Sequence, residues 1–312
     1  MPRKTISKTV KKTGLILVVL IAVVAGIFLF TRPMLAPGFE SPDFSPTLNN
    51  KTVTTGETYS NPNSNVQVGE KVKADSYLIF DELTGKTIAE RKPDTPVAIA
   101  SITKLMTAYV VSKYGDLNST WAINSASTSD INPVLGLVVG DQVIINDLVN
   151  AMIIGSANDA ASALGQYVTT KSGQPMIDLM NKEAKALGMR STHYENPIGF
   201  DSEQNYSTAN DLKLLLDAIR PITLFSSLDR KLLYTFTSET GKTYSVKTTN
   251  SLLAKDPDIH AIKTGFTDEA RGAMITAIHK SNVKFVIIVL GSSDREEDTL
   301  LLKAQILKSF NL

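Results

Sequence analysis

An uncharged run of 19 residues at positions 13–31 constrains this chain more than any other feature of its sequence. About 20 apolar residues are enough to cross the hydrocarbon core of a bilayer. The tail at 1–12 holds five cations and no acid, which predicts that it stays in the cytoplasm. We therefore expect a single-pass anchor in the cell membrane, with the rest of the chain outside the cytoplasm. A cleaved signal peptide, whose apolar core is usually about 7–15 residues, is the alternative and would give a secreted protein.

The chain beyond the apolar run divides into a linker and one large domain. Five of the 13 prolines fall in residues 32–72, among Asn, Ser, Thr and Gly. Apolar residues there show neither the spacing of a helix nor that of a strand. Such a segment is typical of a flexible tether. Residues 73–312 are enough to form one domain with a sizeable core. The predicted organisation is a basic tail at 1–12, an anchor at 13–31, a linker at 32–72 and a domain at 73–312.

Composition excludes several classes of function. The formal net charge is +1, so the chain as a whole lacks the basic balance of a nucleic-acid-binding protein. Cysteine is absent, which excludes disulfides, thiolate metal sites and cysteine nucleophiles. The three histidines, His193, His260 and His279, show none of the spacings of a zinc site. There is no phosphate loop or dinucleotide-binding fingerprint either, so we expect neither a metal nor a cofactor.

Hydrophobic patterning in 73–312 predicts an α+β fold. Four segments alternate or are rich in β-forming residues and are predicted strands: 76–81, 86–90, 273–279 and 284–290. Apolar residues recur at helical spacing in the segments between and after them, which are 101–112, 147–154, 159–167, 176–187, 206–219 and 298–310. The order is strands, many helices, strands and a helix. It favours an antiparallel sheet assembled from both ends of the domain, with a helical insert between them.

Three short motifs occur in order along the domain: Ser101-Ile-Thr-Lys104, Ser156-Ala-Asn158 and Lys263-Thr-Gly265. Each alone is weak, because the chain repeats the patterns at 281–284, 309–311 and 12–14. Context favours the first set. Its serines lie where a loop gives way to a helix and in a loop between two helices, and its second lysine opens a strand-like segment. The repeats fall on a strand, at the C-terminus and at the membrane boundary, where they could not converge.

Ser101 and Lys104 form a candidate nucleophile and base. Residues three apart at a helix start share one face, so the lysine amine can reach the serine hydroxyl. That hydroxyl needs a base to take its proton, whereas an ordinary lysine, with a pKa of about 10.4, is almost always protonated at pH 7. Burial and a neighbouring cation, for which Lys263 is the candidate, would lower the pKa of Lys104. The plain alternative is a helix-capping serine beside a surface lysine.

Longer stretches around these motifs resemble the serine D-Ala-D-Ala peptidases, which are low-molecular-mass penicillin-binding proteins of the D,D-carboxypeptidase type. The similarity runs from about Tyr77 to Phe310 and includes 100–108, 154–160, 196–200, 208–211 and 262–268. The resemblance implies a β-lactamase/transpeptidase-like fold. It also implies a penicillin-sensitive acyl-enzyme reaction on peptidoglycan stem peptides that end in D-Ala-D-Ala, with β-lactams as covalent inhibitors.

The resemblance assigns a role to each motif position. The implied catalytic residues are Ser101 as nucleophile, Lys104 as general base for acylation, Ser156 and Asn158 as substrate-orienting and proton-relaying groups, and Lys263 as the source of the local field. The implied substrate-binding residues are Thr264 and Gly265 along the substrate strand, Phe266, whose backbone N–H would complete an oxyanion hole with that of Ser101, and Arg295, which would hold the terminal carboxylate. The alternative interpretation of Arg295 is an ordinary surface arginine, because the segment before it differs in length from the family pattern.

The chain also departs from the family pattern. Ser156-Ala-Asn158 replaces the frequent Ser-Gly-Asn, and alanine fits if the middle residue needs no positive φ. The turn at 269–272 is less glycine-rich than usual, and the chain ends where many relatives continue into a β-rich domain and a C-terminal anchor. Because short relatives include D,D-endopeptidases that cut cross-links, that activity is the main alternative to a carboxypeptidase. A β-lactamase, a non-turnover β-lactam-binding sensor and a degenerate binding scaffold are further alternatives with less support.

Overall fold

The computed structural model describes residues 71–128, 132–222 and 230–312, all within a compact unit that spans 58–312. The predicted tail and anchor, and residues 32–70 of the predicted linker, lie outside the described residues. Among the described residues, no helix combines the length and apolar character that crossing a bilayer requires.

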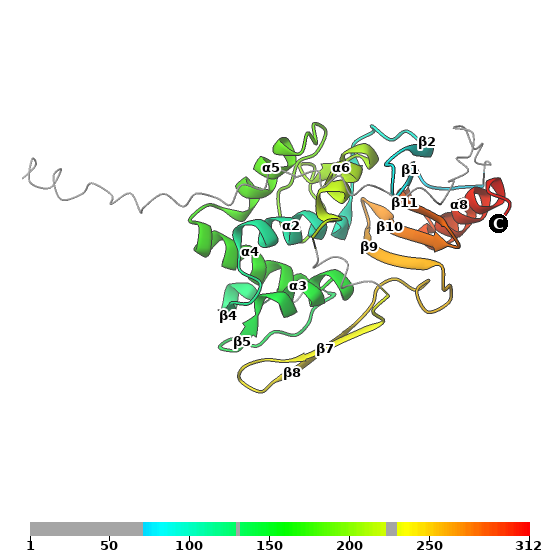
Figure 1. Cartoon of the computed structure of the whole chain (residues 1–312). Coiled ribbons are helices and arrows are strands. Elements are labelled where there is room, and N and C mark those ends of the chain that lie inside the picture. The colour runs from blue at the N-terminus through cyan, green and yellow to red at the C-terminus, as the bar shows by residue number, and fades with distance from the viewer. Residues whose placement is uncertain (1–70, 129–131, 223–229) are drawn as a thin grey trace, which may run out of the picture. The chain divides into compact units, whose positions relative to one another are not determined.

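A five-stranded antiparallel sheet forms one half of the described domain (Figure 1). Its strands, in spatial order, are β2 (Thr87–Arg91), β1 (Ser76–Asp81), β11 (Val283–Ser292), β10 (Arg271–Lys280) and β9 (Ile259–Thr267). The first strands of the domain pair with its last one, since Ile79 lies opposite Ile287. The prediction of an antiparallel sheet built from both chain ends is therefore confirmed.

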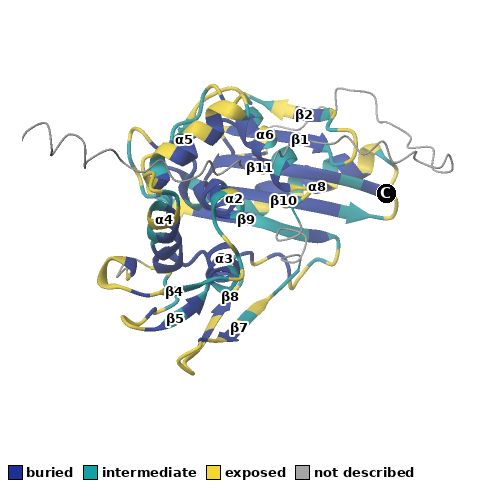
Figure 2. Cartoon of the chain, turned by 60° about the vertical axis from the view of Figure 1, so that its left-hand side comes forward, coloured by how far each residue is buried: buried dark blue, intermediate teal, exposed yellow. Residues whose placement is uncertain are grey.

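Both faces of this sheet are covered by helices. Alternate residues of β1 enter different cores, with Leu78 and Phe80 on one face and Tyr77 and Ile79 on the other. The helix α8 (Arg295–Ser309) packs on the second face, as Figure 1 shows. Strands that are buried on both faces read as nearly continuous apolar runs. Figure 2 accordingly shows β1, β10 and β11 as largely buried.

The helical half lies between β3 (Val97–Ala98) and β7 (Leu233–Thr237) in the chain. Its helices are η1 (Ala100–Thr103), α2 (Lys104–Tyr114), η2 (Ser125–Ser127), α3 (Ile145–Ile154), α4 (Asn158–Ser172), α5 (Met176–Ala186) and α6 (Ala209–Ile219). Leu105, Met106 and Val110 of α2 are fully buried, so this helix is the core of the half. Every predicted helix is present, with ends that differ by a few residues, and two of the changed N-termini, those of α2 and α6, are informative.

The two changes have local causes. Residues 100–103 form a 3₁₀ turn, and the α-helix begins only at Lys104. The helix predicted from 206 begins at Ala209, because the side chain of Thr208 caps it by accepting from the N–H of Asp211. Tyr206–Ser207 form β6 and pair with β3 instead.

Two short antiparallel strand pairs were not predicted. One consists of β4 (Thr120–Ala122) and β5 (Gln142–Ile144), and the other is the hairpin of β7 (Leu233–Thr237) and β8 (Thr243–Lys247). Near the base of β8, Val246 packs against the loop that follows α3: a Cβ at Gly155 would lie 2.5 Å from the Cβ of Val246. The hairpin of β7 and β8 therefore packs beside the loop that contains Ser156.

Candidate active site

Ser101 and Lys104 meet as the motif predicted. Ser101 lies in η1, and its Oγ is 2.8 Å from the Nζ of Lys104 at the start of α2. Side chains three residues apart are eclipsed in a 3₁₀ turn, whereas they are offset in an α-helix. The 3₁₀ turn thus aligns the hydroxyl and the amine more directly than the predicted α-helix would.

Lys104 is completely buried, and burial lowers the pKa of its amine to about 7. Taking a charged group out of water disfavours its charged form, which for lysine means a lower pKa. Burial is the resolved cause of this shift, and the expected contribution of Lys263 stays a prediction. Near neutral pH a large share of Lys104 is therefore unprotonated, and its lone pair can accept the proton of the Ser101 hydroxyl.

The amine of Lys104 also contacts the loop at 196–200. The carbonyl of Ile198 accepts from Nζ of Lys104 at 2.5 Å. The Oδ1 of Asn196 accepts from the N–H groups of Ile198, Gly199 and Phe200 at 3.3, 2.7 and 3.0 Å, which fixes the turn that presents this carbonyl. Sequence reasoning included Asn196 in the resemblance but assigned it no role. The signal was an Asn two residues before the bonded carbonyl, a common turn-forming arrangement.

The loop between α3 and α4 carries Ser156, as predicted. Ser156 itself has a left-handed backbone, with φ of +58°, while Ala157 has φ of −59°. The expectation that alanine fits because the middle residue needs no positive φ is therefore confirmed. Asn158, 3% exposed, is the first residue of α4, and its N–H donates to the carbonyl of Pro133 at 2.8 Å. The left-handed residue is the serine, which marks a strained position at the site.

Lys263 connects this loop to the sheet. It lies in the middle of β9 and not at the start of a strand as predicted. Its Nζ donates to the Oγ of Ser156 at 2.9 Å and to the carbonyl of Thr264 at 2.8 Å. Burial, followed by the charges of Lys104 and Arg295, holds the pKa of Lys263 well below its ordinary value. The amines of the two lysines are therefore electrostatically coupled.

Gly265 allows β9 to approach the nucleophile. A Cβ at this position would lie 3.0 Å from the Cβ of Ala100, the carbonyl of Ile99 and the N of Ser101. A side chain would therefore push the strand away from η1. The next residue, Phe266, follows on the same strand with its side chain 66% exposed. This close approach brings Gly265, the residue before Phe266, against the N–H of Ser101, where the resemblance expected an oxyanion hole.

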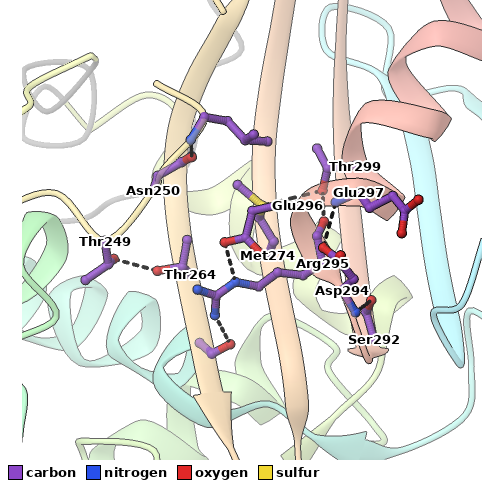
Figure 3. A network of polar contacts seen from close by, with 12 residues as sticks. Thr249, Asn250, Thr264, Met274, Ser292, Asp294, Arg295, Glu296, Glu297 and Thr299 are labelled. Carbon is purple, nitrogen blue, oxygen red and sulfur yellow. Dashed lines mark hydrogen bonds and ion pairs between the residues drawn. The ribbon is translucent and has the colours of Figure 1, made fainter. Parts of the chain in front are cut away.

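Arg295 reaches the same strand from the first turn of α8. Its Nη1 donates to the carbonyl of Gly265 at 2.6 Å, and its Nε donates to Oε1 of Glu296 at 3.0 Å (Figure 3). The side chain is 17% exposed, and the carbonyl that it contacts belongs to the residue after Thr264. Arg295 is therefore part of the site wall and not an isolated surface arginine. The free N–H groups of a guanidinium suit a carboxylate ligand.

The structure brings the three motifs together. Lys104 contacts Ser101, Lys263 contacts Ser156, and Gly265 lies against Ser101. The repeat at 281–284 begins in the turn that follows Lys280, the last residue of β10. Phe266 lies opposite Gly272, near the other end of that strand. A site with a hydroxyl, a neutral amine and nearby backbone N–H donors is equipped for acyl transfer.

Comparisons with known proteins agree with this geometry. Residues 61–294 match the family model described as D-alanyl-D-alanine carboxypeptidase. A D-alanyl-D-alanine endopeptidase of Pseudomonas aeruginosa is 37% identical over 73% of this chain and 74% of its own length. The carboxypeptidase DacF of Bacillus subtilis is 27% identical over 72% of this chain, which spans only 59% of that relative. The crystal structure of the Streptomyces K15 DD-transpeptidase has a TM-score of 0.68, at 27% identity over 77% of this chain and 98% of that one.

Proposed function

Because the chain belongs to the D-alanyl-D-alanine carboxypeptidase family of serine hydrolases, we propose that it removes the terminal D-Ala from peptidoglycan pentapeptides through an acyl-enzyme on Ser101. One observation carries the proposal. The Oγ of Ser101 lies 2.8 Å from the amine of Lys104, and burial lowers the pKa of that amine to about 7. A nucleophile in contact with a neutral base is the minimum that serine acyl transfer requires.

Acylation begins with the Oγ of Ser101 attacking the carbonyl carbon of the penultimate D-Ala. The hydroxyl proton passes to the neutral Nζ of Lys104 as the carbon–oxygen bond forms. The backbone N–H groups of Ser101 and Phe266 stabilise the negative oxygen of the tetrahedral intermediate, and one such donor is typically worth about 10²–10³ in rate. The intermediate collapses when the carbon–nitrogen bond to the terminal D-Ala breaks.

The leaving amine takes a proton from the hydroxyl of Ser156, which Lys263 holds at 2.9 Å. Ser156 recovers its proton from the protonated amine of Lys104, so the proton first removed from Ser101 leaves with D-Ala. Asn158 orients the peptide, and Arg295 holds the terminal carboxylate. In deacylation, water attacks the acyl carbon and gives its proton to Lys104. Lys104 returns this proton to the Oγ of Ser101 as the acyl–oxygen bond breaks, and the tetrapeptide leaves with a new carboxyl group, which ionises in water.

Cleavage of peptide cross-links is a second candidate function. It is supported by the similarity to the Pseudomonas aeruginosa endopeptidase, of which the chain covers 74%. The two activities share the acyl-enzyme chemistry and differ in the size of the leaving group. Geometry at Ser101 and Lys104 therefore supports both equally.

Release of free D-Ala from a pentapeptide separates the two activities. We expect residues 33–312 to release D-Ala from a pentapeptide ending in D-Ala-D-Ala faster than they split a cross-linked muropeptide dimer at equal concentration. Both products are measured by chromatography with one enzyme preparation. Faster cleavage of the dimer would replace the carboxypeptidase with the endopeptidase, and cleavage of neither substrate would remove both.

We also propose that residues 13–31 hold the protein in the cell membrane, with the catalytic domain outside the cytoplasm. The 19-residue uncharged run and the five preceding cations support this proposal. The full chain should sediment with membranes and resist extraction with carbonate, while a chain that begins at residue 33 should not. Recovery of the full chain as a shortened soluble species would favour the cleaved signal peptide.

A further inference from the structure

Thr249 lies between the two walls of the site. Its backbone N–H donates at 3.2 Å to the carbonyl of Ile154, the last residue of α3 before the loop that carries Ser156. Its hydroxyl oxygen lies 2.5 Å from that of Thr264 on β9, and Figure 3 shows the two side chains directed toward each other. One residue thus contacts both the serine loop and the strand of the second lysine. Thr249 belongs to none of the motifs found in the sequence.

The position of Arg295 decides which hydroxyl must donate when a carboxylate is bound. A threonine hydroxyl has one hydrogen to donate, whereas a carboxylate only accepts. A carboxylate held by Arg295 would lie next to Thr264, because the guanidinium is bonded to the carbonyl of Gly265. Thr264 can donate to this carboxylate only if it does not donate to Thr249. Thr249 must therefore donate to Thr264.

We propose that Thr249 is a positioning residue that orients the hydroxyl of Thr264 toward the carboxylate of the substrate. Its donated hydrogen bond occupies a lone pair of Thr264 and turns the single hydrogen of Thr264 toward the ligand. Hydrogen bonds in such a chain also polarise and strengthen one another. Because Thr264 is only 4% exposed, water is a poor substitute for the lost donor.

This inference rests on the proposed function, because it needs a ligand with a carboxylate beside the reacting carbonyl. Penicillin has such a carboxylate, and its methyl ester lacks the negative charge. The ratio of the acylation rates for the free acid and the ester therefore reports on the carboxylate subsite alone. A general distortion of the site would slow both compounds and leave the ratio unchanged.

The experiment measures these two acylation rates for wild type, Thr249→Val and Thr249→Ser. Valine keeps the branched shape and removes the hydroxyl, while serine keeps the hydroxyl. We expect Thr249→Val to lower the rate for the free acid about tenfold, which corresponds to one lost hydrogen bond to a charge-binding group. The ester should react at the wild-type rate. Thr249→Ser should recover most of the free-acid rate.

Thr243→Val is the matched control, because Thr243 is an exposed threonine on β8, the strand that precedes Thr249, and its hydroxyl contacts that of Thr237 across the hairpin. It should leave both rates unchanged. Equal slowing of acid and ester in Thr249→Val, or no slowing of either, would overturn the role of Thr249 while leaving the proposed function intact. Failure of wild type to react with either compound would instead overturn the proposed function, and the inference with it.

Discussion

Replacement of Lys104 by methionine is expected to slow acylation of Ser101 by about 10²–10⁴-fold, the range that a positioned general base contributes. Methionine has a similar length and suits this completely buried position, so the change removes the base without opening a large cavity. The measurement is the rate of labelling by a fluorescent penicillin. The control is Lys171→Met, an exposed residue in the last turn of α4, which should label like wild type. Rapid labelling of the Lys104 variant would assign the base to another group.

The same lysine predicts how activity depends on pH. Its pKa of about 7 in the folded protein divides a neutral, proton-accepting form above this pH from a charged, inactive form below it. The value of kcat/KM for release of D-Ala should therefore fall about tenfold per pH unit below pH 7 and reach a plateau above it. A rate that fell as the pH rose through 7 would mean that the charged lysine is the active form.

Replacement of Ser101 by alanine should have the largest effect of any single change. Loss of a serine nucleophile lowers kcat by about 10⁶-fold in a comparable hydrolase, and we expect at least about 10⁴-fold here, measured as release of D-Ala. The fold should persist, since Ser101 is only half-buried and its side chain forms a hydrogen bond with Lys104 across a single helical turn. Near-wild-type far-UV circular dichroism and melting temperature would show this.

The second copy of the motif supplies the control for this variant. Ser281 begins the other serine–lysine pattern, in the turn between β10 and β11. Ser281→Ala should retain full turnover, because nothing places this serine beside a neutral amine. Loss of activity in Ser281→Ala, or its retention in Ser101→Ala, would show that the wrong serine has been assigned.

Much of the fold could be predicted because local patterns and tertiary packing agree. The strand at 76–81 has the predicted ends, since a turn follows it directly and its residues alternate between two cores. The hairpin of β7 and β8 was missed even though its buried and exposed residues alternate, because exposed threonines and lysines dilute the apolar signal. The start of α6 was displaced because a cap at Thr208 overrode the longer apolar period.

The site was predictable where a motif fixes both residue type and spacing, and not where backbone geometry decides. Ser101, Lys104, Ser156 and Lys263 converge as expected. The roles of Asn196 and Thr249 depend on contacts across more than 10 residues of sequence, between segments whose approach no local pattern encodes. The burial that lowers the pKa of both lysines is a tertiary property, so no local sequence pattern encodes its extent.

The activation of Ser101 by Lys104 is the central claim, and the most direct test is to locate the covalent adduct. After brief exposure of residues 33–312 to penicillin at pH 8, the intact mass should increase by one penicilloyl group per chain. Digestion should place this group on the peptide that contains Ser101. An adduct on any other residue, or the absence of an adduct from a folded protein, would contradict the account.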